Sequence, residues 1–120
     1  MIEFVWEYTI HPDKRGLFEL VFGPGGAWSL AFAGAEGYRG TSVMRDSDNG
    51  DRYMLVDVWD SPEDFERATN ENAAAYAELQ TTLAELTTER HQHGMFQLLQ
   101  QASVRPNPKD KRGRTGRRRG

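Results

Sequence analysis

His91 and His93 are the residues of this sequence best suited to acid–base chemistry. An unperturbed imidazole titrates near neutral pH, so either residue could remove a substrate proton as a general base. The two side chains share one face if a strand begins near residue 91. With Asp57 or Glu89 they could instead form part of a metal site, but no further ligand stands at a characteristic spacing, so we expect no metal. The alternative without chemistry is a half-exposed pair at a strand edge.

Asn72 and Tyr76 belong to an apolar stripe with helical spacing that also contains Phe65 and Leu79. A polar side chain in such a stripe needs a hydrogen-bond partner. Asn72 is therefore either a core residue bonded to the backbone or a donor that lines a cavity. In the second case Tyr76, one turn later, shares that cavity, and both could stabilise an oxyanion.

Aromatic side chains could form the walls of the same cavity. Trp6 and Tyr8 alternate on one face of a predicted strand, Trp59 ends another strand, and Phe65 begins the long helical stripe. Flat aromatic walls suit a flat aromatic ligand. The alternative is that all four residues are ordinary core.

The elements that position these residues can be read from periodicity and turn signals. Alternation predicts strands over 2–10, 38–45 and 52–59, and a fourth strand over 95–99 that begins near residue 91. A first helix after Pro12 is interrupted by glycines and a proline at 23–26, and a second runs from Ser61 to about Thr88. The order β-α-β-β-α-β predicts an α+β, ferredoxin-like fold with an antiparallel four-stranded sheet and both helices on one face.

Two of the predicted strands carry apolar residues on both faces. Val5 lies opposite the aromatic row of the first strand, and Met54, Val56 and Val58 lie opposite the aromatic row of the third. Helices on one face of the sheet would leave the other apolar face in water. We therefore expect a homodimer that buries sheet against sheet around a two-fold axis.

Charge is distributed unevenly along the 120 residues. Residues 105–120 contain eight Lys or Arg and one Asp, a net charge of +7, whereas residues 1–104 carry −10. We expect one domain over 1–104 and a basic, disordered tail over 105–120. The tail could bind nucleic acid or anionic membrane, but no aromatic residue is interleaved for base stacking, so a solubilising role is favoured.

Several classes of protein are excluded by composition. The chain has no cysteine, which rules out disulfides, Cys-ligated zinc and a thiol nucleophile. Its longest uncharged stretch, 20–35, is short and broken by glycines, so no membrane span is expected. Glu3 and Glu7 stand where a signal peptide would carry Lys or Arg, so the expected location is the cytoplasm.

Four segments of the sequence resemble the antibiotic biosynthesis monooxygenase family over roughly residues 2–100. They are FVWEY near the N-terminus, FGPGGAW within the first helix, EGYRGT before the second strand, and RYMLVDVWDSPEDFE around the third strand. The resemblance implies a dimeric α+β barrel. Members of this family include cofactor-independent oxygenases that act on aromatic or quinol substrates, as well as haem-degrading enzymes.

The resemblance also bears on cofactors. The haem-degrading branch has an Asn on the first strand, a Trp in the second helix and an iron-ligating His later in that helix. Tyr8, Ala68 and Glu78 occupy these positions, so we expect no haem and no other cofactor. The expected function is a cofactor-independent monooxygenase with an aromatic or quinol-type substrate. The alternatives are a non-catalytic module of the same fold that binds a small ligand, and an adaptor that acts through the basic tail.

Overall fold

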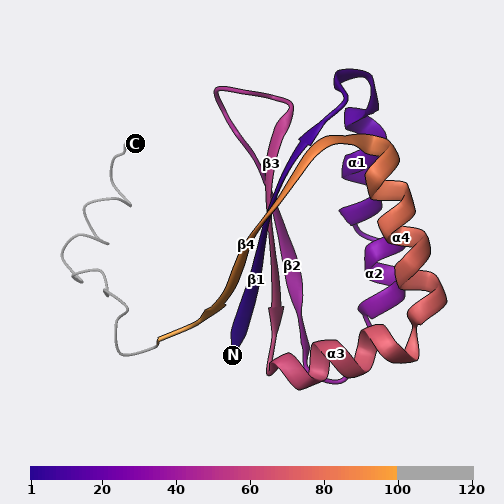
Figure 1. The fold of residues 1–120 in the computed structure, drawn as a ribbon, viewed down its shortest axis with the longest axis vertical. Helices are drawn as coiled ribbons and strands as arrows, with labels where there is room; N and C mark the ends of the chain where they lie inside the picture. Colours follow the sequence, from indigo (N-terminus) through magenta and orange to yellow (C-terminus); the bar gives the residue numbers. More distant parts are fainter. Residues whose placement is uncertain (100–120) are drawn as a thin grey trace, which may run out of the picture.

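The computed structural model describes residues 1–99 of the chain. Its bounds are β1 Ile2–Ile10, α1 Arg15–Phe22, α2 Ala27–Phe32, β2 Tyr38–Arg45, β3 Arg52–Trp59, α3 Pro62–Glu71, α4 Ala73–Leu86 and β4 Thr87–Gln97, with a 3-10 turn at Pro12–Lys14 before α1 (Figure 1). The predicted ranges of the first three strands are confirmed. The predicted boundary at residue 104 and the tail over 105–120 lie outside the described residues.

The four strands form one antiparallel sheet in the order β2-β3-β1-β4. This is the predicted ferredoxin-like topology, and the α helices lie together on one side of the sheet (Figure 1). Paired residues share a face of the sheet, and the register places Asp57 of β3 between Phe4 of β1 and Thr41 of β2. The edge strand β2 therefore brings a hydroxyl group next to a carboxyl group on the side that the helices cover.

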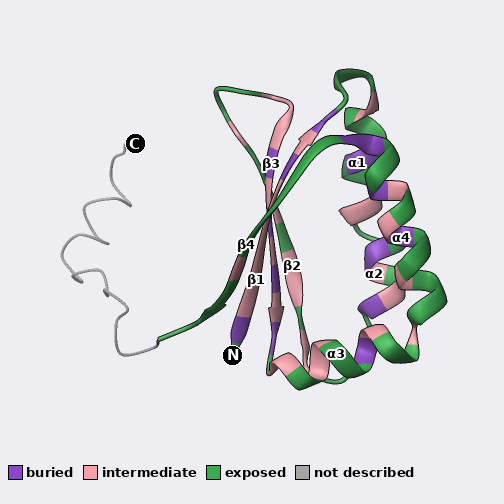
Figure 2. Cartoon of the chain, viewed as in Figure 1, coloured by how far each residue is buried: buried purple, intermediate pink, exposed green. Residues whose placement is uncertain are grey.

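Burial alternates along β3 as the sequence predicts (Figure 2). Tyr53, Leu55, Asp57 and Trp59 are buried, whereas the intervening residues are only partly buried. The buried row packs against aromatic side chains of α1 and α2, with Phe18 against Tyr53 and Phe32 against Trp59. The core is thus the layer between the sheet and the helices, and Asp57 is an acidic residue within it.

The break between α1 and α2 has the backbone geometry that its glycines permit. Gly25 has φ of +74°, in the left-handed region that favours glycine. Gly26 has ordinary dihedral angles, but an added Cβ would overlap the carbonyl oxygens of Leu20 and Val21. The chain can therefore turn tightly between α1 and α2, which brings Trp28 over the sheet.

The helix predicted from Ser61 to Thr88 is in fact two helices, and the prediction of one is wrong. Its start is confirmed, because Ser61 Oγ accepts a hydrogen bond of 3.1 Å from the backbone N–H of Asp64. The break falls at Asn72, whose backbone leaves the helical region and whose Nδ2 donates to the carbonyl of Ala68 at 3.0 Å. Side-chain amides that compete for backbone groups in this way often end helices, and α4 runs in a new direction (Figure 1).

The fourth strand begins earlier than predicted, at Thr87 rather than near residue 91. Thr87 pairs with Ile10 of β1, and its Oγ1 donates to the carbonyl of Leu83 at 2.7 Å. The polar residues from Thr87 onward are also typical of the exposed surface of a helix. The β-branched threonines, however, favour a strand. In the part of the chain that the structure describes, no helix is long and apolar enough to cross a membrane.

Candidate functional site

Asp57 is a carboxyl group in the core, with 2% of its surface exposed. Its Oδ1 accepts hydrogen bonds from Nε1 of Trp28, at 3.2 Å, and from the hydroxyl of Thr41. Its Oδ2 lies 3.5 Å from Nε1 of Trp59. These donors come from α2, β2 and β3, and all three are uncharged.

Burial raises the pKa of Asp57 above the usual carboxyl range, because a charge is poorly solvated in the core. The hydrogen bonds from Thr41, Trp28 and Trp59 favour the carboxylate and oppose part of this rise in pKa. A carboxyl group in this environment can gain and lose a proton closer to neutral pH than an exposed one. That property is typical of catalytic acids and bases.

Two hydroxyl groups connect Asp57 to the edge of the sheet. Thr41 hydrogen-bonds Asp57, and the hydroxyl of Tyr38 lies 2.5 Å from Oγ1 of Thr41. Thr41 has one hydroxyl proton, so when it donates to an ionised Asp57 it accepts from Tyr38. Burial raises the pKa of Tyr38, which keeps its hydroxyl protonated at neutral pH. A proton can therefore pass between the Tyr38 oxygen and Asp57 by transfer along the two hydrogen bonds, each hydroxyl accepting one proton and giving up its own.

The hydroxyl pair lines a cavity of about 360 Å³ between β2 and the break after α1. Its lining consists of Phe22, Gly23, Pro24, Trp28, Ser29, Tyr38, Gly40 and Thr41. The volume is within the range of small-molecule sites, and aromatic rings with a few polar groups are a typical lining for them. The buried carboxyl of Asp57 is thus connected, through the two hydroxyls, to a cavity that could hold an aromatic ligand.

Three of the predicted site residues meet in one aromatic cluster behind this cavity. Phe65 lies edge-on to Trp59 and to Tyr76, with ring centroids 5.5 and 6.3 Å apart. Tyr76 also packs against Trp28, at 6.3 Å. Trp59 is completely buried and bonds Asp57, so its contact with a ligand would be indirect.

The other predicted walls, Trp6 and Tyr8, lie nearer to α1. Their rings are stacked with centroids 6.1 Å apart, and Tyr8 is almost fully buried against Phe18 and Phe22. Burial raises the pKa of Tyr8. Asn72 lies at the junction of α3 and α4, where its amide satisfies a backbone carbonyl. The structure therefore places Trp6, Tyr8 and Asn72 away from the lining of the cavity beside Asp57.

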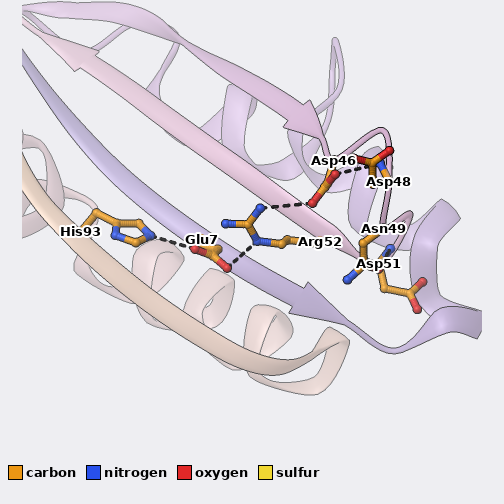
Figure 3. A network of polar contacts seen from close by, with 7 residues as sticks. All are labelled: Glu7, Asp46, Asp48, Asn49, Asp51, Arg52 and His93. Atoms are coloured by element: carbon orange, nitrogen blue, oxygen red, sulfur yellow. Dashed lines mark hydrogen bonds and ion pairs between the residues drawn. The ribbon is translucent and has the colours of Figure 1, made fainter.

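The two histidines lie on the opposite face of the sheet. His91 pairs with Glu7, whose side chain points away from the helices, and Nε2 of His93 donates to Oε1 of Glu7 at 2.9 Å (Figure 3). Oε2 of Glu7 accepts from Nε of Arg52 at 2.7 Å, and these contacts lower the pKa of Glu7 to about 2. The sheet therefore separates His91 and His93 from the aromatic cavity, and their role as a base stays a prediction.

The sequence suggested Asp57 only as a possible metal ligand beside the histidines, and it did not indicate Thr41, Tyr38 or Trp28 as site residues. One signal was available, since Asp57 is the acidic member of the row that contains Leu55 and Trp59. An acid in a buried strand row needs donors. The donors themselves could not be assigned, because Trp28 and Thr41 come from elements whose register depends on the folded chain.

The family model of antibiotic biosynthesis monooxygenase (ABM) matches residues 1–78, a range that contains Asp57 and all of its hydrogen-bond donors. The chain belongs to the ABM family. The relationship predicted from the sequence is thereby confirmed. No curated protein is significantly similar to the chain in sequence.

Solved structures share the ABM fold of this chain. A variant of SnoaB, a cofactor-independent oxygenase from Streptomyces nogalater, is 25% identical with a TM-score of 0.68, and the match covers 88% of this chain and 97% of SnoaB. Rv0793 from Mycobacterium tuberculosis is 16% identical with a TM-score of 0.66, covering 85% and 98%. PA3566 from Pseudomonas aeruginosa is 12% identical with a TM-score of 0.60, covering 82% and 94%. The two lower identities show the fold alone.

Proposed function

We propose that this ABM protein is a cofactor-independent monooxygenase that oxidises a polycyclic aromatic or quinol-type substrate in the cavity beside Tyr38. The observation that carries the proposal is the buried Asp57, linked through Thr41 and Tyr38 to that cavity. Membership of the ABM family and the likeness to SnoaB, a cofactor-independent oxygenase, support it.

The first step is removal of a substrate proton. A hydroxyl of the substrate, such as the hydroxyl of the enol form of an anthrone, donates a hydrogen bond to the Tyr38 oxygen. As its proton moves to Tyr38, the Tyr38 proton passes to Thr41 and the Thr41 proton passes to Asp57. Tyr38 and Thr41 end as neutral hydroxyls, Asp57 is protonated, and the negative charge remains on the aromatic substrate.

The second step uses electrons of the substrate anion to reduce oxygen. The ring carbon that carries the charge bonds to O₂, and the resulting peroxide takes a proton back through the same relay. Loss of the remaining C–H proton with cleavage of the O–O bond gives a ketone and water. For an anthrone the balance is CH₂ + O₂ → C=O + H₂O, so the substrate supplies all four electrons. Phe22 and Trp28 cover part of the cavity and reduce the contact of the anion with water.

In this proposal Asp57 is the base, in place of His91 or His93. The carboxyl lies on the helix side of the sheet, as the cavity does, whereas both histidines lie on the other side. Trp28 and Trp59 hold the carboxyl in place through their indole N–H groups. The roles of Asn72 and Tyr76 as oxyanion donors, and of Trp6, Tyr8, Trp59 and Phe65 as walls, stay predictions, and none of these six residues lines the cavity beside Tyr38.

The proposal is tested by oxygen uptake with dithranol (1,8-dihydroxyanthrone) at pH 7, with chelator present and the uncatalysed rate subtracted. General-base removal lowers rates by about 10² or more, so we expect Asp57→Asn to lose at least a hundredfold in kcat. Thr41→Val, which keeps the shape but not the hydroxyl, should also lose most of the rate. The matched control is Asp60→Asn, an exposed acid paired with Arg39, which should stay within twofold.

Two results would contradict the proposal. If His93→Gln abolished uptake while Asp57→Asn retained it, the base would be on the other face of the sheet. If the wild-type protein bound dithranol and was protected against heat without consuming oxygen, a non-catalytic binding module would be the correct description.

A further inference from the structure

A second hollow of about 290 Å³ lies next to the cavity beside Tyr38, along the edge strand β2. The second hollow is lined by Glu19, Phe22, Gly23, Val43, Arg45 and Tyr53. Phe22 and Gly23 belong to both linings, and Gly23 has no side chain to separate them. The two hollows therefore adjoin at Phe22 and Gly23, and we refer to them together as the groove between β2 and the helices.

The distal end of this groove carries a cationic side chain, Arg45, which is about half exposed. Nη1 of Arg45 donates to Oε2 of Glu19 at 3.0 Å, and the hydroxyl of Tyr53 donates to the same oxygen. Glu19 thereby contacts the guanidinium through one nitrogen. A guanidinium has five N–H groups in a planar fork, so Arg45 can hold Glu19 and still bind a carboxylate.

The spacing along β2 sets the length of a molecule that would occupy the whole groove. Thr41 and Arg45 lie on the same face, four residues apart, which is about 13 Å at 3.3 Å per residue. A single phenol ring is too short to reach both ends. The stretch between them is formed by Phe22, Val43 and the bare backbone of Gly23, which suits a flat apolar body.

We propose that Arg45 is a specificity-determining residue that binds a carboxylate on the far end of a fused-ring substrate whose reacting hydroxyl lies at Tyr38. This inference rests on the proposed function and adds the substrate class, an elongated aromatic acid. Arg45 takes no part in the proton relay. It fixes which end of the substrate faces Asp57.

A matched pair of product-like probes tests the subsite by calorimetry. Danthron (1,8-dihydroxyanthraquinone) and rhein (its 3-carboxylic acid) differ only by the carboxyl group. We expect the wild-type protein to bind rhein about tenfold more tightly than danthron, as a charge-assisted hydrogen bond at a partly exposed site would give. Arg45→Gln should remove this preference and leave danthron binding within twofold. Arg39→Gln, a second exposed arginine of β2 paired with Asp60, should keep the preference.

A second variant separates the charge from the shape of the subsite. Glu19→Gln keeps an acceptor for Arg45 but removes the negative charge next to the ligand, so rhein binding should tighten severalfold while danthron binding stays constant. Equal affinity of the wild-type protein for rhein and danthron would overturn the inference. An equal loss of affinity for rhein and danthron in Arg45→Gln would also overturn it.

The binding assay also distinguishes this inference from the proposed function. If Asp57→Asn kept full oxygen uptake while rhein still bound tenfold more tightly than danthron, the proposed base would be wrong and the subsite correct. If Asp57→Asn lost activity but rhein and danthron bound equally, the base would be correct and the subsite wrong.

Discussion

Nε1 of Trp28 donates a hydrogen bond of 3.2 Å to Oδ1 of Asp57, which joins α2 to the inner strand β3 across the core. Both residues are buried. The bond allows a carboxyl group to be buried, because the indole N–H replaces a hydrogen bond that water would otherwise donate to the carboxyl oxygen. It also links the geometry of the α1–α2 break to the proposed proton acceptor, since the break determines where α2 begins.

We expect Trp28→Phe to destabilise the protein by about 3 kcal/mol, from the lost donor and the smaller ring. The hydrogen bond lowers the pKa of Asp57, so its loss should raise that pKa. The acidic limb of the pH–rate profile should then move to higher pH. Urea titration and oxygen uptake between pH 5 and 9 measure both effects. If the variant is destabilised but the acidic limb of its pH–rate profile does not move, Asp57 does not control the rate.

Asp57→Asn should become more stable relative to the wild-type protein as pH rises. The pKa of Asp57 is raised by burial, so the folded state keeps a proton that the unfolded state loses near pH 4. The wild-type protein therefore loses stability from about pH 4 up to the folded-state pKa, and the amide variant lacks this loss. Urea midpoints of both proteins across pH 4–9 test this. A constant difference would mean that the pKa of Asp57 is the same in both states.

The sequence was sufficient for the topology because alternation and turn residues act locally. The strand around Asp57 could be assigned to its full length, and its faces were assigned correctly. The break at Asn72 was missed because the stripe keeps its helical spacing across it, and only a side-chain bond to Ala68 reveals the turn. The candidate site could not be predicted, because Trp28, Thr41 and Asp57 are distant in sequence and meet only through sheet register and helix packing.

Glu7 should contribute to stability at neutral pH and lose that contribution in acid. Arg52 and His93 lower its pKa to about 2, so the stabilisation is complete above the unfolded value near 4.3 and decreases as pH falls toward 2. The stability difference between the wild-type protein and Glu7→Gln should therefore be largest at pH 6–7 and shrink below pH 4. Glu3→Gln, on the same face of β1, controls for the change in net charge. An equal pH dependence in the two variants would contradict the assignment.

Gly26→Ala should destabilise the fold by about 2 kcal/mol, because its Cβ would overlap the carbonyl oxygens of Leu20 and Val21. The α1–α2 turn would have to open, which should also weaken ligand binding beside Trp28. Gly16→Ala is the matched control, since no atom beyond its chain neighbours and the adjacent backbone of α1 lies within 4 Å of the added Cβ. It should gain about 0.5 kcal/mol from helix propensity. Thermal denaturation of both variants is the measurement, and equal effects would refute the steric argument.

We expect the wild-type protein to be a homodimer and Val56→Lys to be a monomer. Val5, Met54, Val56 and Val58 lie on the sheet face that the helices leave uncovered, and Val56 pairs with Val5 and Ser42 at its centre. An apolar face of this kind indicates an interface, and a buried lysine there would leave an unpaired charge. Light scattering coupled to size exclusion should give about twice 13.7 kDa for the wild-type protein and 13.7 kDa for the variant.

The control for this change is Glu66→Lys, at an exposed position of α3, which should stay dimeric. A wild-type protein that is monomeric at micromolar concentration would contradict the expected sheet-to-sheet dimer. In that case the pairing of Glu7 with Arg52 and His93 would remain in water, and its effect on stability would weaken in high salt. A dimer that excludes solvent from this face would instead protect the same ion pairs from salt, so the salt dependence of stability provides an independent test of the interface.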